Sequence, residues 1–128
     1  MAVTATGLLD TSVVIALAGS VAPELPDEAA VSTMTLAELR LGAALAAANQ
    51  RPGRLAVLAH AKQTFDALPV DRAVAGQYGE LVASMRRAGQ RPGVADALIA
   101  ATALAHDLAL YTLDEDFRGV PGLRLGGI

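Results

Sequence analysis

The sequence predicts one α/β domain built around a mainly parallel β-sheet. Its 128 residues suit a single compact domain and leave no room for a second. Short apolar segments of strand length alternate with longer segments in which apolar residues recur at helical spacing. Hydrophobic residues make up 53% of the chain, many of them Ala and very few aromatic, which favours closely packed helices. Because strands that alternate with helices build βαβ units, the sheet is expected to be parallel.

Five segments are predicted as strands because each is a short apolar run bordered by turn residues or by a helical segment. In order they are Gly7–Asp10, Ala30–Thr33, Ala67–Val70, Leu108–Thr112 and, at an edge, Leu123–Leu125. The segment Val21–Glu28 contains Pro23 and Pro26 and is predicted as a loop.

Five segments are predicted as helices from their apolar periodicity and their start and stop signals. They are a helix that Asp10 begins and Val13–Leu17 continues, Thr35 to about Ala48, Arg54–Asp66, Asp71–Ala88 and Val94–His106. Gln50–Gly53 and Gly89–Gly93 each contain Pro-Gly and are predicted as turns, and Leu113–Gly119 as a turn-rich loop.

Several classes of protein are excluded by composition. The chain has no cysteine, so disulfides, zinc–thiolate sites and thiol nucleophiles are impossible. Met1–Thr6 carries no positive charge and no sustained apolar run, unlike a signal peptide. The longest later apolar runs, such as Leu41–Ala48, fall short of the roughly 20 residues of a membrane helix. We therefore expect a cytoplasmic protein without membrane contact.

Five acidic residues stand where a parallel sheet gathers its functional groups, beyond the carboxyl ends of the strands. Asp10 ends the first strand, and Glu38 is expected in the first turn of the helix after the second strand. Asp96 lies in the first turn of the Val94 helix, and Asp114 and Asp116 follow the fourth strand directly. The topology therefore predicts that these acids meet at one edge of the sheet.

Each acid also has an ordinary structural explanation. Asp10 is a good helix cap, and Thr35-x-x-Glu38 has the form of a capping box. A negative charge at Asp96 suits a helix N-terminus, and Asp114 and Asp116 are typical turn residues.

The surroundings of Asp96 favour the functional interpretation. Between Val94 and Ala105 only Asp96 and Thr102 are polar, so this helix is predicted to be buried on nearly every side. A carboxylate in such a place is costly unless it is paired or binds a metal, and no Lys or Arg lies within one turn. Oxygen ligands alone select a hard ion, Mg²⁺ or Mn²⁺. His60 and His106 are not expected to take part.

The net charge of −3 does not exclude a nucleic-acid partner. If five of the 13 acids hold a metal, eight remain against ten basic residues, nine of which are Arg. Arginine forks suit bidentate contacts with phosphate. Arg40, Arg86, Arg87 and Arg91 are candidates for RNA backbone contact, and an ordinary solvated surface is the alternative for all four.

Four segments together resemble the successive signature blocks of the PIN-domain family, and most closely its VapC-type toxins. They are Leu8–Val13 (LLDTSV), Thr35–Arg40 (TLAELR), Val94–Thr102 (VADALIAAT) and Tyr111–Phe117 (YTLDEDF). The resemblance covers Gly7 to Leu125 and implies a single PIN-like domain over residues 1–128. It implies a three-layer α/β/α fold with a mainly parallel central sheet of about four to five strands.

The resemblance also implies roles for particular residues. Asp10, Glu38, Asp96 and Asp114 match the acidic quartet that binds the metal. Asp116 matches a further acid of the last block, so the choice between Asp114 and Asp116 as the fourth ligand stays open. Ser12 and Thr112 match small hydroxyl residues that line the site.

The activity implied by the resemblance is Mg²⁺- or Mn²⁺-dependent hydrolysis of RNA, typically tRNA or rRNA. Proteins of this kind are toxins that form homodimers, and a cognate VapB-type antitoxin inserts a C-terminal segment, often with an Arg, into the active site. Asp10, Asp96, Asp114 and in some arrangements Asp116 would hold one or two ions, while Glu38 would bind a second ion or orient the attacking water.

Two other functions fit parts of the sequence. An Asp after the first strand also occurs in proteins that transfer phosphate through an aspartyl intermediate. However, Ser12 stands where such a phosphatase has a second acid, and no basic residue follows the Tyr111 strand before Arg118, as a receiver domain requires. A non-catalytic PIN-like interaction module is the other alternative, and the complete set of acids argues against it.

Overall fold

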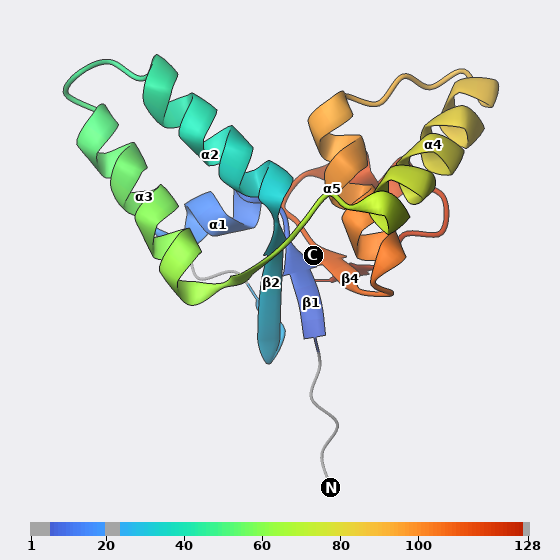
Figure 1. The fold of residues 1–128 in the computed structure, drawn as a ribbon, viewed down its shortest axis with the longest axis horizontal. Coiled ribbons are helices and arrows are strands. Elements are labelled where there is room, and N and C mark those ends of the chain that lie inside the picture. The colour runs from blue at the N-terminus through green and yellow to red at the C-terminus, as the bar shows by residue number, and fades with distance from the viewer. Residues whose placement is uncertain (1–5, 20–23, 127–128) are drawn as a thin grey trace, which may run out of the picture.

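The computed structural model describes residues 6–19 and 24–126 (Figure 1). The strands are β1 (Thr6–Leu9), β2 (Glu28–Ser32), β3 (Asp66–Leu68), β4 (Ala109–Tyr111) and β5 (Leu125–Gly126). The helices are α1 (Thr11–Leu17), α2 (Thr33–Leu45), α3 (Arg51–Thr64), α4 (Arg72–Arg87), α5 (Val94–Ala105) and a short 3₁₀ helix, η1 (Glu115–Gly119).

The five strands form one sheet in the order β3-β2-β1-β4-β5, and every neighbouring pair is parallel. The predicted α/β class and parallel sheet are therefore confirmed. The chain first builds outward from β1 through β2 to β3, and then returns to the other side of β1 with β4. The strand order thus reverses between β1 and β4, which is where open α/β sheets place their binding sites.

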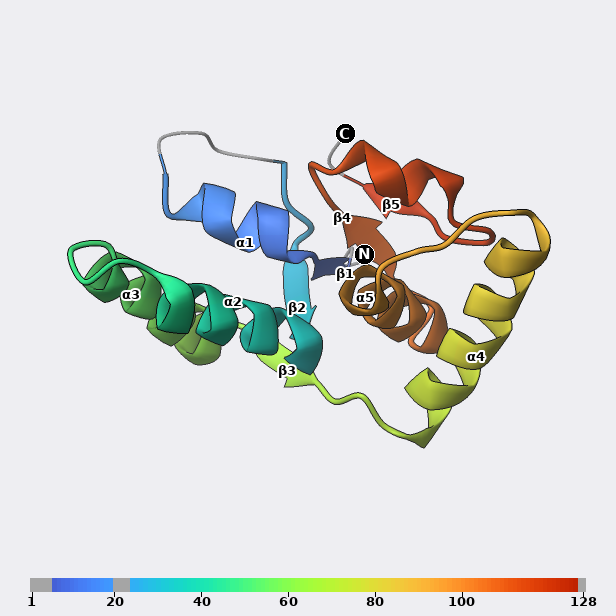
Figure 2. The same cartoon turned by 90° about the horizontal axis from the view of Figure 1, so that it is seen from above.

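Helices cover both faces of the sheet, as Figure 2 shows, so the predicted three-layer arrangement is also confirmed. Neighbouring strand residues point to opposite faces. Leu8 and Leu110 belong to one apolar core, with Ile99 of α5 and Leu81 of α4. Leu9 belongs to the other core, which is completed by side chains of α1, α2 and α3.

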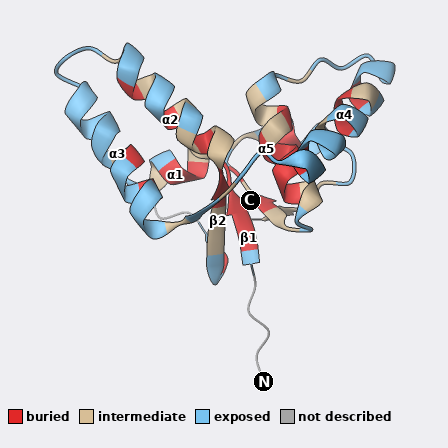
Figure 3. Ribbon diagram, in the orientation of Figure 1, coloured by how far each residue is buried: buried red, intermediate tan, exposed pale blue. Residues whose placement is uncertain are grey.

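Helix α5 is the most deeply buried helix of the described chain (Figure 3). Apart from Val94, which is 62% exposed, none of its residues is classed as exposed. This confirms the burial predicted from its composition. Asp96 therefore sits in the first turn of a helix that is largely buried.

Several predicted boundaries were wrong by a few residues. Helix α2 begins at Thr33, not Thr35, because Ser32 Oγ accepts the Met34 amide at 3.0 Å and caps the helix. Helix α3 begins at Arg51, so Pro52 and Gly53 of the first predicted break lie in its first turn. Proline is tolerated there because the first N–H groups of a helix have no partner within the helix. The second break, over Gly89–Gly93, is a true turn in which Gly89 has a φ of +82°.

Two further predictions have more limited outcomes. Residues 21–23 of the predicted loop Val21–Glu28 lie outside the described residues, and its last residue begins β2. Within the described chain, no helix is long and apolar enough to cross a membrane.

Candidate active site

The candidate site lies at the carboxyl ends of β1 and β4. The Asp10 amide donates to the Tyr111 carbonyl at 3.0 Å, so the two strands stay paired up to the point where their acidic segments begin. In Figure 1 this end of the sheet lies at the base of a V whose arms are α2–α3 and α4–α5. The strand ends therefore bring together segments that are about a hundred residues apart in sequence.

Asp10 is held in one orientation by three hydrogen bonds. Its side chain is only 3% exposed. Oδ1 accepts Ser12 Oγ at 2.5 Å and the Val13 amide at 3.2 Å, while Oδ2 accepts Thr112 Oγ1 at 2.6 Å. Asp10 therefore does cap α1, as the ordinary explanation predicts, but one oxygen is turned toward β4 instead.

The two hydroxyl groups that were predicted to line the site also hold the loop after β4. Ser12 Oγ accepts the Leu113 amide at 3.1 Å, and Thr112 Oγ1 accepts the Asp114 amide at 2.9 Å. Each hydroxyl thus joins Asp10 to the segment that carries Asp114. Asp114 Oδ1 in turn accepts the Asp116 amide at 2.9 Å and caps η1.

Glu38 does not form the predicted capping box. Because α2 begins at Thr33, Glu38 lies in the second turn of the helix and not in the first. Its Oε1 instead accepts Thr11 Oγ1, 2.6 Å away at the start of α1. Thr11, which sequence reasoning missed, therefore anchors Glu38 beside Asp10.

Asp96 lies within electrostatic range of the other four acids. Burial raises the pKa of the Asp96 carboxyl above its ordinary value of 3.8, and the negative charges of Glu38, Asp114, Asp10 and Asp116 raise it further. These four groups are the ones that the strand and helix ends were predicted to bring together. The fold therefore brings each of these four acids within electrostatic range of Asp96.

No basic side chain neutralises this cluster within the described chain. The ion pairs there are Arg118–Glu115 and Arg124–Asp107, and both are exposed. Glu115 thus pairs with Arg118 of the same 3₁₀ helix, although in the sequence it stands between Asp114 and Asp116. Helix capping accounts for single acids, but it does not account for five neighbouring acids that have no cationic partner among the described residues.

The donor chemistry of the cluster fits a hard divalent cation. All the side-chain donors are carboxylate or hydroxyl oxygens, which suit Mg²⁺ or Mn²⁺. Within residues 6–19 and 24–126, no three acidic or histidine side chains already surround one point at ligand distance. His60 and His106 are exposed on α3 and at the far end of α5.

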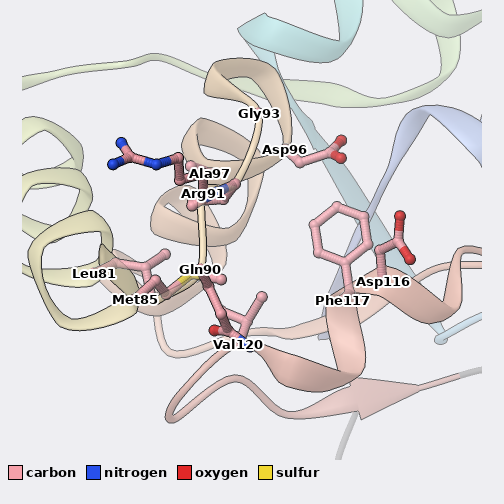
Figure 4. A pocket seen from close by; sticks show the side chains of 11 residues that line it. Leu81, Met85, Gln90, Arg91, Gly93, Asp96, Ala97, Asp116, Phe117 and Val120 are labelled. Carbon is pink, nitrogen blue, oxygen red and sulfur yellow. The ribbon is translucent and has the colours of Figure 1, made fainter. Parts of the chain in front are cut away.

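A pocket of about 280 Å³ opens beside two of the acids (Figure 4). Asp96 and Asp116 form one side of it, and Phe117, Met85 and Leu81 form an apolar wall. A second pocket, of about 320 Å³, lies among α1, α2 and α3 and includes Thr11 and Glu38. Asp96 and Asp116 thus line one pocket, and Glu38 lines the other.

The four arginines proposed for RNA contact are spread over the surface. Arg91 lines the pocket beside Asp96, while Arg86 and Arg87 are exposed in the last turn of α4. Arg40 is exposed on α2 and lines another pocket, together with Arg51. Arg54, which the sequence did not single out, lies in the same pocket as Glu38, and only the packing of α3 on α2 reveals this.

Comparison with known proteins identifies relatives over nearly the whole chain. The PIN-domain family model matches residues 7–123. The chain is 38% identical over 122 residues to Ribonuclease VapC5 of Mycobacterium tuberculosis, covering 92% of this chain and 90% of that protein. It is 45% identical over 100 residues to Ribonuclease VapC8 of the same species, covering 76% of this chain and 89% of that protein.

A solved structure has the same fold. The crystal structure of VapBC-5, a member of the VapBC family of toxin–antitoxin systems from M. tuberculosis, contains a chain that superposes with a TM-score of 0.82 at 34% identity. The match covers 94% of this chain and 99% of that one.

Proposed function

The chain belongs to the PIN-domain family, in its VapC group, and on this premise we propose that it is a metal-dependent ribonuclease, the toxin of a toxin–antitoxin pair. The observation that carries the proposal is the group formed by Asp96 and the four carboxylates that act on it, none of them paired with a basic side chain in the described chain. Such a group needs a cation to be stable in its ionised form. The relatives that it matches in sequence are ribonucleases by name.

In this proposal Asp10, Asp96 and Asp114 would hold Mg²⁺ or Mn²⁺, with Asp116 as a further ligand. When bound, such an ion lowers the pKa of a water and stabilises the charge that develops on the phosphate oxygens. Ser12 and Thr112 keep Asp10 oriented through their hydrogen bonds. Glu38, anchored by Thr11, is placed to accept a proton from the attacking water or to hold a second ion.

The substrate we propose is RNA, with tRNA and rRNA as the first candidates. Arg91 and Arg54 lie in the two pockets that flank the acids, and both suit contacts with backbone phosphates. In the same proposal Arg40, Arg86 and Arg87, which line neither of these two pockets, would contact more distant parts of the RNA backbone. The protein would act in the cytoplasm, where these RNAs are found.

The partner we propose is a VapB-type antitoxin. Structures of related toxins are toxin–antitoxin complexes by description. The pocket among α1, α2 and α3 combines apolar groups, Ile15, Leu39 and Val57, with the carboxylate of Glu38. An antitoxin segment with apolar residues and one Arg would match it, and the exposed Leu41 and Leu45 of α2 offer further apolar surface for the antitoxin or for a homodimer.

Phosphate transfer of the receiver-domain kind finds no support in the fold, and Ser12 still stands where an aspartyl phosphatase has its second acid. A receiver domain has the strand order 2-1-3-4-5, whereas this sheet has the order β3-β2-β1-β4-β5. Incubation with acetyl phosphate and mass analysis at acid pH should therefore show no added phosphate on the protein.

The deciding experiment is RNA cleavage by three purified proteins: the wild type, Asp96→Asn and Glu115→Gln. Glu115 is the matched control, because it is an exposed acid paired with Arg118 and lies beside the cluster without joining it. We expect Mg²⁺- or Mn²⁺-dependent cleavage by the wild type and by Glu115→Gln, and none by Asp96→Asn or in EDTA. Equal cleavage by Asp96→Asn at saturating Mg²⁺ would overturn the proposed site.

Metal binding can be measured separately from cleavage. Calorimetric titration with Mg²⁺ should show binding to the wild type and a large loss of affinity in Asp10→Ala. If both proteins bind alike, the metal is not held by this cluster. If the wild type binds no Mg²⁺ or Mn²⁺, the chain is an interaction module with a PIN fold instead.

A further inference from the structure

The pocket beside Asp96 and Asp116 has a construction that the metal chemistry does not need. It is walled by the end of α4, the loop before α5, the first turn of α5 and η1. Figure 4 shows the Phe117 ring next to the two carboxylates, with Met85 and Leu81 on the far side and Val120 below. Leu81, Met85 and Phe117 belong to the apolar core, and where they border the pocket they place an apolar surface directly beside the two carboxylates.

We propose that this pocket receives one unpaired nucleobase of the RNA, next to the phosphate that is cut, and that Gln90 reads its edge. The inference rests on the proposed ribonuclease function and adds a specificity site to it. It concerns the apolar and polar residues that line the pocket beside Asp96 and Asp116.

The position of the pocket favours a base. A phosphate held at a cation on Asp96 and Asp116 would lie at the mouth of the pocket, because the same two side chains line it. The base of an adjoining nucleotide would then be within reach of the apolar wall. Bases in single-stranded RNA are bound in this way, with an apolar or aromatic surface against the ring and polar groups at its edge.

The size and rigidity of the pocket favour a single base. Its volume of about 280 Å³ is just below the range of about 300–1,000 Å³ that is usual for small-molecule sites. Phe117 is 2% exposed and Met85 and Leu81 are each 6% exposed, so the wall is fixed by the core behind it. A preformed wall lowers the ordering cost of binding. A base inside duplex RNA could not enter, so the occupant must be unpaired.

The polar rim suits the edge of a base. Gln90 lines the pocket and is exposed, and its amide can both donate and accept hydrogen bonds. The backbone amide of Gln90 donates to the Met85 carbonyl, 2.9 Å away, which holds the position, and among residues 6–19 and 24–126 its side-chain amide has no hydrogen-bond partner. Arg91 follows directly, and Figure 4 shows its guanidinium turned away from the acids, which suits a neighbouring phosphate better than the base itself.

The test compares base preferences around the cleavage position. A single-stranded RNA library with random sequence is cut by the wild type, Gln90→Ala, Val120→Trp and Gln63→Ala, and the new 5′ ends are sequenced. Gln63 is the matched control, an exposed glutamine of α3 that lies in none of the pockets described above. Asp96→Asn serves as the blank for contaminating nucleases.

We expect one position beside the cut to show a clear base preference with the wild type and with Gln63→Ala. Gln90→Ala should flatten the preference at that position alone, by about tenfold or more, since one well-made contact with a base edge contributes about 1–3 kcal/mol. Val120→Trp fills the pocket and should reduce cleavage of RNA that carries a base there, while RNA with an abasic ribose at that position should be cut equally by the wild type and the variant.

Three results would overturn the inference. If the wild type cuts but all the variants share one base profile, the pocket is not a base site and the ribonuclease function stands. If the profile is unchanged while Gln90→Ala or Val120→Trp loses co-purification with a coexpressed VapB-type antitoxin, the pocket is a protein-docking site. If the wild type cuts no more than Asp96→Asn, the proposed function fails and this inference with it.

Discussion

The hydroxyl of Thr112 lies 2.6 Å from Oδ2 of Asp10, although the two residues are 102 positions apart in sequence. Both atoms are buried, so the contact is shielded from water. The same hydroxyl accepts the Asp114 amide. One small side chain therefore links two acids that follow the neighbouring strands β1 and β4.

Replacing Thr112 by Val should weaken metal binding and cleavage by about 10–100-fold, as removal of a group that orients a metal ligand typically does. Thr112→Ser keeps the hydroxyl and should recover most of both. The measurements are the Mg²⁺ dependence of cleavage and calorimetric titration. Thr64→Val, on the exposed face of α3, is the control that should change neither. An unaltered Mg²⁺ affinity in Thr112→Val would show that the contact does not position Asp10.

Asp96→Asn should raise the melting temperature of the metal-free protein at neutral pH. The pKa of Asp96 is raised in the folded protein, so its ionised form destabilises the fold at every pH above that raised value. As the pH falls through the raised pKa toward 3.8, the ordinary value, this penalty disappears and the two proteins should converge. Thermal unfolding in EDTA between pH 4 and 8 tests this, with Glu115→Gln as the control.

Magnesium should reverse that order of stability. A bound ion stabilises the wild type by about 2.7 kcal/mol at a hundred times its Kd, and Asp96→Asn should gain less. A variant that is less stable than the wild type in EDTA at pH 7 would contradict the assigned cost of the Asp96 charge.

Glu38→Gln should lower kcat by about 10²–10⁴-fold, the range expected for loss of a general base. The fold should be kept, because the amide oxygen can still accept the Thr11 hydroxyl that is 2.6 Å from Oε1 in the wild type. Single-turnover cleavage at saturating RNA and Mg²⁺ gives the rate, and unfolding curves check the fold. If kcat is unchanged and only the Mg²⁺ affinity falls, Glu38 is a metal ligand and not the base.

Ser32→Ala should cost about 1 kcal/mol of folding free energy, the usual contribution of a helix cap. Ser32 Oγ accepts the Met34 amide and is fully buried. Gln50→Ala is the matched control, because Gln50 precedes α3 without a side-chain cap bond and should change stability little. Chemical denaturation measures both. Equal effects of the two substitutions would mean that Ser32 does not cap α2.

Sequence patterns were sufficient for the architecture because they reflect burial, which acts on whole segments. The apolar stretch of Val94–Ala105 could only be an enclosed helix, and it is one. The positions of the acids followed from the same logic, since parallel strands end at a common edge. The metal and the roles of the acids remain proposals, whereas their convergence is a property of the fold.

Local signals were insufficient where several residues compete for the same position. Ser32, Thr33 and Thr35 are all residue types that can cap a helix. The sequence favours Thr35, because Glu38 three residues later completes the pattern of a capping box. The fold selects Ser32, which is buried at the end of β2 with its Oγ 3.4 Å from Thr102 Oγ1 of α5. Glu38 therefore lies in the second turn of α2, where its Oε1 accepts a hydrogen bond from Thr11 Oγ1.

The sequence alone determined the α/β class, the parallel sheet and the set of acids at its edge, because hydrophobic periodicity and strand–helix order are written along the chain. Only the tertiary structure decided how those acids are held and what stands beside them. The Thr112–Asp10 and Thr11–Glu38 contacts, and the pocket between α4, α5 and η1, join segments that meet through packing, and packing depends on side-chain shape in three dimensions, which no linear pattern records.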